Sequence, residues 1–370
     1  MRKTKSTKSQ KSFNLFSNKS LQDFVFTALI FAIMLIIISS PKRFTSGTIS
    51  GLKLFFYSVL PGLFPFMLLT KLLTEIGFLY KTTSKLDKFS RKIFGTPGVS
   101  IYALSMSVIS GYPIGAKIIS DLHEKKLITE QDAKKMSIFC TTSGPIFIIG
   151  SVGTMMFGNI KIGIILYVSH IISSIVLGII YNLFSKEHSC KNTIIHNPQI
   201  QTYSKQENIF AKCVSETINS LFVVGAYITI FYLISEMFDA FNIFESLTTI
   251  TSKLLYFSQI RPETIKGFFY GMIEVTRGCK ELSTIASPLS VSICSGILSF
   301  SGLSIIMQSM SFLKNAKIKM CSFVLSKLAH MILSIFFCYL LCIAFFFVWR
   351  NMFYAVDCRF KTITITLYNR

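Results

Sequence analysis

Charged residues are scarce in this chain, and acidic ones most of all. Only 15% of the 370 residues are charged, with 17 acidic residues against 38 basic ones. A soluble domain carries roughly 25% charged residues, so the chain lacks the polar surface that a soluble or disordered protein needs. Its apolar residues gather in long runs at 24–39, 160–184 and 321–349. Because about 20 apolar residues cross a bilayer as a helix, the sequence predicts an all-α polytopic integral membrane protein.

Motifs for nucleotide binding, metal binding and hydrolysis are also missing. The sequence contains no Walker A motif, no HExxH and no GxSxG. Its nine cysteines form no CxxC pair, and most lie in apolar runs, where cysteine behaves as a small hydrophobic residue. We therefore expect no enzyme, no metal and no cofactor. The formal net charge of +21 comes from Lys and Arg in the gaps between apolar runs, a pattern that orients membrane helices, so we expect no nucleic-acid partner.

Basic stretches, apolar runs and polar gaps divide the chain into segments. The first 20 residues hold six Lys or Arg and no acid, and no small-residue cleavage site follows the next apolar run. This pattern indicates a retained anchor rather than a cleaved signal peptide. The expected segments are a basic cytoplasmic arm (1–20), a signal-anchor helix (21–40), a first gate-type repeat (50–184), a polar linker (185–208), a second gate-type repeat (209–349) and a polar tail (350–370).

The apolar segment 99–122 is interrupted at its centre by Ser-Gly-Tyr-Pro-Ile-Gly at 110–115, and basic stretches flank it on both sides. Both basic stretches favour the cytoplasm. A segment whose ends lie on one side must enter the membrane and return, which predicts a re-entrant hairpin of two half-helices. Non-helical backbone at that depth is tolerated where it lines a cavity or is buried in protein. A kinked helix with small residues for close packing is the alternative.

Polar landmarks of the first half recur in the second half at offsets of 163, 158 and 160 residues. The matched pairs are Gly-Ala-Lys at 115–117 with Gly-Cys-Lys at 278–280, Phe-Cys-Thr-Thr-Ser-Gly at 139–144 with Ile-Leu-Ser-Phe-Ser-Gly at 297–302, and His170 with His330. A cytoplasmic linker between two such repeats would invert the second. An inverted repeat with re-entrant helical hairpins and broken helices is the architecture of many secondary transporters. The basic tail would then be external, which disagrees with the positive-inside rule.

The broken elements are expected to converge on a substrate site. Half-helix ends expose backbone N–H groups that suit an anion, while unwound carbonyls and hydroxyls suit a small cation. A coupling ion, Na⁺ or H⁺, therefore stays open. The candidate substrate-binding residues are Ser110, Gly111, Tyr112, Pro113, Gly115, Lys117, Thr142, Ser143, Gly144, Glu274, Thr276, Arg277, Lys280, Ser299, Ser301 and Ser304.

Charged side chains inside an apolar segment need an explanation, and three of them fall within 274–280. Each costs roughly 2.5–3.5 kcal/mol within the membrane, so they require partners, water or a ligand. An internal pair of Glu274 with Arg277 is the structural alternative to a binding role. For His170 and His330, a hydrogen bond to a neighbouring helix is favoured over a proton relay. Three further charged residues are expected to lie near the membrane surface: Lys71, Glu75 and Glu236.

Together these motifs resemble a known family. The stretches 110–117, 140–153, 274–278 and 299–304 are similar to the sporulation integral membrane protein family of endospore formers, the YlbJ or SpoVV type. The resemblance covers about residues 50–347 and implies a nucleoside-recognition gate domain. The stretch 299–304 with Gln308 is also similar to a hairpin region of concentrative nucleoside transporters, in which Ser299 stands where those proteins have Asn.

The resemblance implies transport of dipicolinic acid (pyridine-2,6-dicarboxylate) across the outer forespore membrane during sporulation. Dipicolinate is a flat dianion at neutral pH, so Lys117, Arg277 and Lys280 would offer complementary charge, and Tyr112 could stack on the ring. We expect a secondary transporter of a small anionic solute in the lipid bilayer, with its oligomeric state open. The alternatives are a transporter of a nucleoside-like solute and a non-transporting membrane scaffold or sensor in spore maturation.

Overall fold

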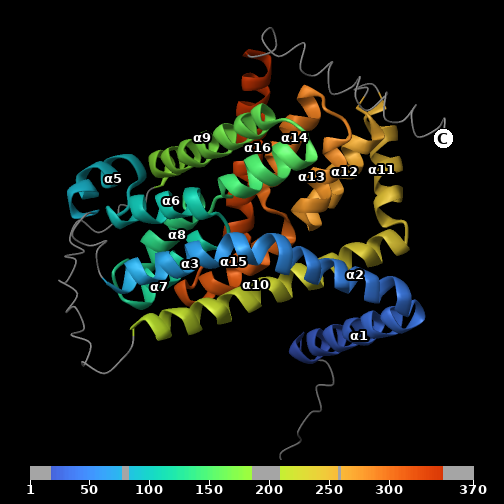
Figure 1. Cartoon of the computed structure of the whole chain (residues 1–370), viewed down its shortest axis with the longest axis horizontal. Helices are drawn as coiled ribbons and strands as arrows, with labels where there is room; N and C mark the ends of the chain where they lie inside the picture. Colours follow the sequence, from blue (N-terminus) through green and yellow to red (C-terminus); the bar gives the residue numbers. More distant parts are fainter. Residues whose placement is uncertain (1–17, 77–82, 186–208, 257–259, 345–370) are drawn as a thin grey trace, which may run out of the picture. The chain divides into compact units, whose positions relative to one another are not determined.

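The computed structural model describes residues 18–76, 83–185, 209–256 and 260–344, and all regular structure in these ranges is helical (Figure 1). The all-α expectation is therefore confirmed. The polar tail and most of the polar linker (185–208) and of the basic arm lie outside the described residues, so their assignments stay predictions.

The chain divides into two compact units, 1–47 and 48–370. The first unit contains α1 (Asn18–Ser39) and the beginning of α2 (Pro41–Leu54). The helix α1 covers most of the segment predicted as a signal anchor, and its large apolar side chains, such as Phe24, Leu35 and Ile38, are exposed. A helix that presents apolar residues in this way suits contact with lipid.

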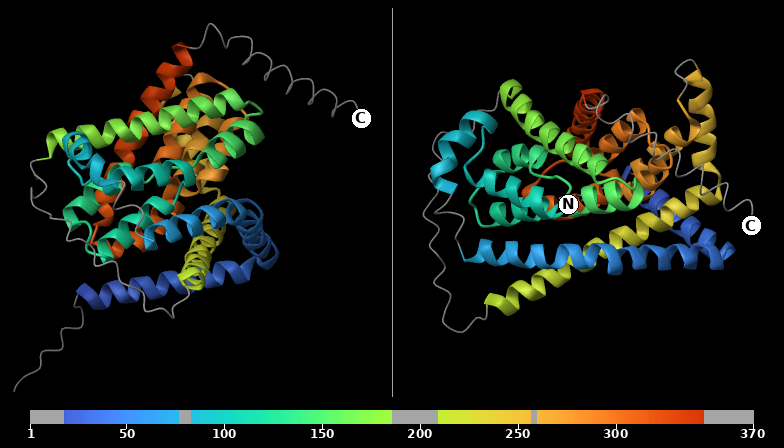
Figure 2. Two further views of the ribbon diagram at one scale, coloured as in Figure 1. Left: turned by 60° about the vertical axis from the view of Figure 1, so that its left-hand side comes forward. Right: turned by 45° about the horizontal axis from the view of Figure 1, so that its top comes forward.

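The second unit holds the elements that form the candidate site. After the end of α2 these are η1 (Phe55–Val59), α3 (Leu60–Glu75), η2 (Ser84–Leu86), α5 (Asp87–Phe94), α6 (Val99–Ser110), α7 (Ile114–Glu124), α8 (Glu130–Phe139), η3 (Ile146–Met156), α9 (Ile160–Phe184), α10 (Ile209–Ala240), α11 (Ile243–Leu254), α12 (Pro262–Ile273), α13 (Val275–Ser283), α14 (Pro288–Phe300), α15 (Gly302–Leu313), η5 (Lys314–Ala316) and α16 (Met320–Ala344). Figure 2 shows α3 and α10, which pack against each other, crossing along one side of this unit.

Several helices are long and apolar enough to cross a membrane. In the described ranges these are α9, α10, α16 and the stretch Pro288–Ala316, which contains α14 and α15. The count of four rises to six if each of two bent pairs, α1 with α2 and α5 with α6, forms one span. The chain is therefore a multi-pass integral membrane protein, and the lipid bilayer is its surrounding medium.

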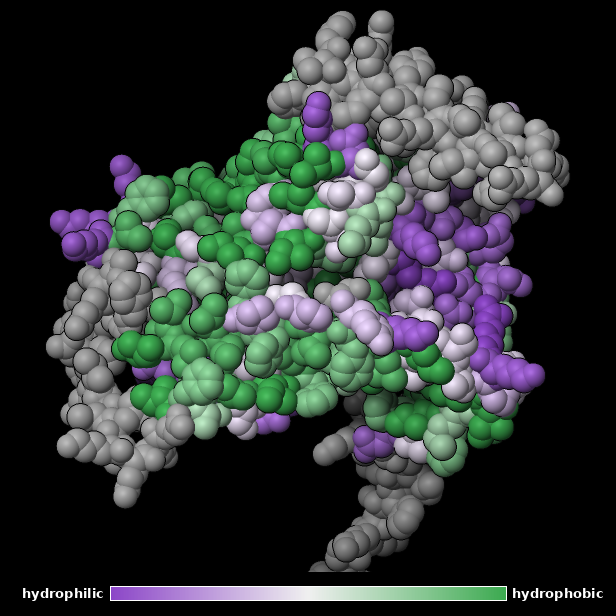
Figure 3. All heavy atoms as spheres, in the orientation of Figure 1, coloured by the Kyte–Doolittle hydropathy of each residue, from purple (hydrophilic) through white to green (hydrophobic). Residues whose placement is uncertain are grey.

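The outer surface of these helices is apolar and their inner faces carry polar groups. Figure 3 shows hydrophobic residues over much of one face of the molecule, with hydrophilic ones gathered toward the side of α11. Intramembrane polar residues typically face the interior of a helix bundle, and α16 follows this rule. Its exposed side chains include Leu325, Ile332 and Phe336, whereas its buried ones include Lys327, His330 and Ser334.

The two halves present helices in the same order. In the first half, α6 and α7 pack against each other across a break, the broken element α8–η3 follows, and the long helix α9 comes next. In the second half, α12 and α13 pack together, the broken element α14–α15 follows, and α16 is the long helix. The breaks fall where the sequence predicts them. The orientation of the two halves in the membrane, and with it their inversion, stays a prediction.

Candidate functional site

The helix breaks of both halves meet at a cavity of about 250 Å³. Its polar wall comes from the α6–α7 break, the α8–η3 break, the α12–α13 break and the start of α15. These polar lining residues are Ser110, Gly111, Tyr112, Ser143, Gly144, Ser151, Glu274, Thr276, Ser304 and Gln308. The rest of the wall is mainly apolar and includes Leu63, Phe147, Met156 and Ile228. A mostly apolar cavity with a few convergent polar groups is typical of a small-molecule site.

Glycine brings the first two breaks into contact. Gly111 has a φ of +83°, a conformation that glycine adopts without steric cost. A Cβ atom at Gly111 would overlap the backbone nitrogen of Gly144, so the two backbones approach too closely for a side chain at position 111. The same two segments are joined by a hydrogen bond, in which the Thr142 N–H donates to Oγ of Ser107 at 2.9 Å. The tip of the first hairpin is thus fixed directly against the broken helix.

The second hairpin breaks at Glu274, which is 6% exposed. Its carboxylate accepts hydrogen bonds from the backbone N–H groups of Thr276 at 3.1 Å and Arg277 at 2.9 Å. A carboxylate at the N-terminus of a helix is stabilised by the positive end of the helix dipole. Glu274 therefore caps α13 and places its charge in the cavity wall with both oxygens already hydrogen-bonded.

The Arg277 guanidinium points toward α10. It contacts Asp239 at 2.5 Å and Glu236 at 3.3 Å, and it lies over the rings of Tyr232 and Tyr270. The structural alternative of an Arg277–Glu274 side-chain pair is therefore replaced by two acids on another helix, because only the backbone N–H of Arg277 contacts Glu274. Glu236 was expected near the membrane surface, and its contact with Arg277 was not predicted.

The two candidate lysines also lie outside the cavity wall. Nζ of Lys117 is 3.1 Å from Oδ1 of Asp121 and lies over the Phe312 ring at 5.7 Å. Lys280 is exposed in the last turn of α13. All three cations that were expected to hold substrate carboxylates are thus paired elsewhere or point to the surface.

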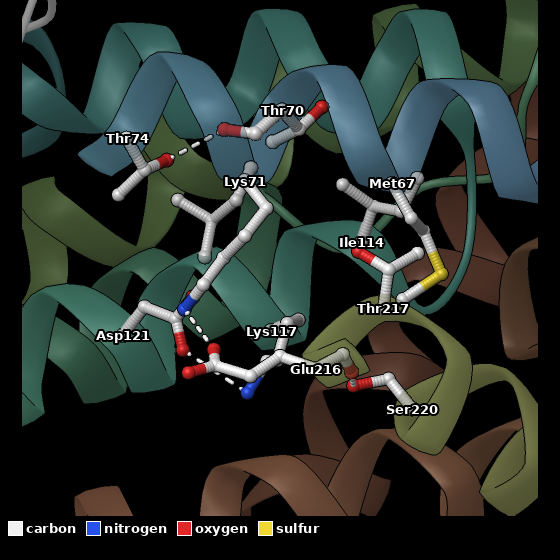
Figure 4. A pocket seen from close by; sticks show the side chains of 11 residues that line it. Met67, Thr70, Lys71, Thr74, Ile114, Lys117, Asp121, Glu216, Thr217 and Ser220 are labelled. Carbon is white, nitrogen blue, oxygen red and sulfur yellow. Dashed lines mark hydrogen bonds and ion pairs between the residues drawn. The ribbon is translucent and has the colours of Figure 1, made fainter. Parts of the chain in front are cut away.

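Lys117 belongs to a charged cluster that joins α3, α7 and α10 (Figure 4). At its centre is Lys71, which lies 2.7 Å from Glu216, 3.1 Å from Asp121 and 3.3 Å from Glu75. The Lys71 side chain is only 12% exposed, so it is held by carboxylates instead of extending to the surface as the sequence suggested. The cluster fixes the second half-helix of the first hairpin to two neighbouring helices.

His170 and His330 lie together in the buried core. Nε2 of His170 accepts from the Ser143 N–H at 2.9 Å, so its Nδ1 carries the proton and donates to Oγ of Ser299 at 2.7 Å. The two imidazole rings lie 4.8 Å apart. The favoured expectation of hydrogen bonds to neighbouring helices agrees with these contacts, and they connect the breaks of both halves.

Lys327 is a buried polar residue that sequence reasoning missed. It lies in the second turn of α16 and is 1% exposed. Its ammonium donates to the Thr141 carbonyl at 2.5 Å and to the Tyr112 hydroxyl at 3.2 Å. A signal was present, because Lys327 is three residues before His330 and shares its helix face.

The structure brings half of the candidate residues to the cavity. The lining candidates are Ser110, Gly111, Tyr112, Ser143, Gly144, Glu274, Thr276 and Ser304. The candidates that do not line it are Pro113, Gly115, Lys117, Thr142, Arg277, Lys280, Ser299 and Ser301. Gln308 lines the wall without having been a candidate, and its Nε2 donates to Oγ of Ser304 at 3.2 Å. Within the described ranges, no group of three or more His, Cys, Asp or Glu side chains could hold a metal ion.

Comparison with known proteins finds a relative over most of the chain. The sequence is 26% identical over 332 residues to the sporulation integral membrane protein YlbJ of Bacillus subtilis (strain 168). The match covers 85% of this chain and 81% of that protein. No family model and no solved structure matches the chain.

Proposed function

The chain is similar over 85% of its length to a sporulation integral membrane protein of the YlbJ type, and from that similarity we propose that it is a secondary transporter of a small anionic solute. Dipicolinate is the favoured substrate, moved across the outer forespore membrane of an endospore former. The observation that carries the proposal is the cavity at which the helix breaks of both halves meet. Broken helices that meet at a central cavity are the binding elements of many secondary transporters.

The size and composition of the cavity support a solute with one ring. Its volume of about 250 Å³ is just below the roughly 300–1,000 Å³ of pockets for drug-sized ligands. Tyr112 lines the cavity, and its ring would offer a flat surface for an aromatic substrate. Backbone N–H groups near the starts of α7 and η3 would meet the carboxylates, since helix N-termini favour anions.

Transport by this chain would use a gradient. Because the sequence has no Walker A motif, the driving force in this proposal is an ion gradient or the gradient of the substrate itself. Na⁺ and H⁺ both remain candidates for a coupling ion. A non-transporting scaffold or sensor would not need a solute cavity inside the bilayer, which is why transport is the preferred function.

A nucleoside-like solute is the second candidate, and one observation favours it. The hydrogen-bonding side chains in the wall, such as Ser143, Ser304 and Gln308, are neutral, and the only carboxylate among the lining residues is Glu274. Neutral donors and acceptors suit sugar hydroxyls and a base. Dipicolinate and a nucleoside therefore compete as hypotheses for one cavity.

Equilibrium binding to the purified protein tests the proposal. We expect labelled dipicolinate to bind and to be displaced by unlabelled dipicolinate far better than by uridine. Replacing Tyr112 by Leu removes a stacking surface worth about 0.5–1.5 kcal/mol, so affinity should fall about two- to tenfold. Tyr112→Phe keeps the ring and should retain more of the affinity than Tyr112→Leu. The control is Tyr339→Leu, because Tyr339 is exposed on α16 and is not among the residues that line the cavity. Binding of labelled uridine that excess dipicolinate does not displace would favour the second candidate.

A further inference from the structure

Lys327 lies one hydrogen bond behind the cavity wall. Its ammonium bonds to the hydroxyl of Tyr112, and Tyr112 lines the cavity at the tip of the first hairpin. The same ammonium lies 4.9 Å from the centre of the Tyr112 ring and 5.5 Å from that of Phe323. Lys327 therefore contacts the hairpin tip through both the hydroxyl and the face of the aromatic ring.

The charge of Lys327 has no counter-ion among the described side chains. Within that part of the chain, no Asp or Glu oxygen comes within 4.0 Å of its Nζ. The hydrogen bonds that it makes go to a neutral carbonyl and a neutral hydroxyl. The carboxylate among the residues that line the cavity, Glu274, has both oxygens hydrogen-bonded to the N-terminus of α13. A buried charge is costly unless it is paired, so this ammonium favours an anion nearby.

Two other largely buried cations do not share this property. Lys71 is surrounded by three carboxylates, and Arg277 by two. Their charges are balanced by carboxylates of the protein, so they contribute little to the attraction of an anionic solute. Lys327 alone, among the buried cations described above, combines an unbalanced charge with a position beside the cavity.

We propose that Lys327 supplies the positive charge that makes the cavity select anionic solutes, with a carboxylate of the solute completing the ion pair across the Tyr112 hydroxyl. The inference rests on the proposed function, because it identifies the residue that recognises the charge of the transported solute. It also assigns that role to a residue outside the candidate set, in place of Lys117, Arg277 and Lys280.

A structural role is the competing explanation. Lys327 connects α16 to Tyr112 and Thr141, which are 215 and 186 residues away along the chain. A neutral donor such as Gln could replace part of this connection but not the charge. The decisive readout is therefore the electrostatic potential of the cavity rather than stability or overall activity.

The potential can be measured with a cysteine reporter and without any substrate. Ser151 lines the cavity and is half-buried, so Ser151→Cys places a thiol in its wall. The reaction rates of an anionic and a cationic methanethiosulfonate reagent are compared in the full-length protein, and the parent chain without the new cysteine gives the background. Relative to a free thiol in solution, the reporter should favour the anionic reagent. A preference for the cationic reagent would overturn the proposal.

The matched variants are Lys327→Gln and Lys280→Gln in the Ser151→Cys protein, since each removes one positive charge. Loss of a nearby charge in a poorly screened site should lower the anionic-to-cationic rate ratio at least about tenfold. Loss of the exposed Lys280 should change it less than about twofold, because solvent screens that charge. Equal changes in both variants, or none in Lys327→Gln, would overturn the proposal. If Lys327→Gln does not fold, Lys327→Arg should restore both folding and the anionic-to-cationic rate ratio. The comparison of the Ser151→Cys reporter with a free thiol in solution then still tests the proposal.

Binding separates this inference from the proposed function. In the wild-type protein, dipicolinate should bind more tightly than its neutral analogue pyridine-2,6-dicarboxamide, and Lys327→Gln should reduce that preference at least about tenfold. Absence of dipicolinate binding to the wild type would reject the proposed function, while the reporter ratio would still test Lys327. Binding of dipicolinate with an unchanged preference in Lys327→Gln would reject the role of Lys327 alone.

Discussion

Nε2 of His330 donates a hydrogen bond to the backbone carbonyl of His170 at 3.1 Å, although the two residues are 160 positions apart. They lie on α16 and α9, the long helices that occupy the same place in the order of the two halves. His170 also contacts Ser143 in one broken element and Ser299 in the other. The histidine pair therefore connects the elements that surround the cavity.

This arrangement predicts unequal effects of removing the two imidazoles. His170→Ala leaves the Ser143 N–H and the Ser299 hydroxyl without a partner, and each unsatisfied buried group costs about 1–3 kcal/mol. His330→Ala frees only one carbonyl, so it should destabilise the protein less. Thermal unfolding of the purified variants in detergent measures the difference. A larger loss for His330→Ala than for His170→Ala would mean that the core contacts are assigned incorrectly.

The Arg277 contacts predict strong coupling with Asp239. Arg277→Ala and Asp239→Asn should each destabilise the protein by about 1.5–3 kcal/mol, since both break a charge-assisted hydrogen bond. The double variant should lose little more than either single one. Lys280→Ala, in the same short helix but exposed, is the matched control and should change stability by less than about 0.5 kcal/mol. Additive losses in the double-mutant cycle would show that the two side chains act independently.

Glycine at position 115 is predicted to be essential for the first hairpin. A Cβ atom there would overlap the carbonyl oxygen of Cys140, so Gly115→Ala must push α7 away from the adjacent break. We expect lower stability and loss of substrate binding. Gly150→Ala is the control, because a Cβ at Gly150 meets nothing within 4 Å. Size-exclusion chromatography of both variants, followed by ligand binding, checks this expectation, and a tolerated Gly115→Ala would contradict the close approach.

The charged cluster around Lys71 predicts that its carboxylates contribute unequally to stability. The Asp121 side chain is 7% exposed and contacts both Lys71 and Lys117, whereas Glu216 is 38% exposed. Asp121→Asn should therefore destabilise the protein more than Glu216→Gln, because the buried carboxylate is less screened by water. Thermal unfolding at low and high salt measures the stability loss of each variant. The loss caused by Glu216→Gln should depend more strongly on salt. The reverse order of stability losses would place the centre of the cluster elsewhere.

The positions of the breaks could be predicted because they depend on local chemistry. Gly111 and Pro113 both disfavour an uninterrupted helix, and a carboxylate such as that of Glu274 is a suitable cap for the free N–H groups at the start of a helix. These features are visible in a few consecutive residues. The all-α membrane fold was equally predictable, since it follows from the length and hydropathy of the runs.

The partners of the charged residues could not be predicted in the same way. Asp239 lies 38 residues before Arg277, and Tyr112 lies 215 residues before Lys327. Contacts over such distances depend on helix packing, which periodicity and composition do not specify. The lysines at 117, 280 and 327 look alike in sequence, yet one is ion-paired, one is exposed and one is buried beside the cavity.

Uptake into proteoliposomes that contain the purified protein tests the central claim most directly. Vesicles preloaded with unlabelled dipicolinate should accumulate labelled dipicolinate by exchange, and vesicles with Gly115→Ala protein or without protein should not. Labelled uridine should not accumulate in vesicles preloaded with uridine. Exchange of dipicolinate but not uridine is the result that transport of a small anionic solute predicts. Exchange of uridine alone, or of neither solute by protein that is folded and inserted, would contradict it.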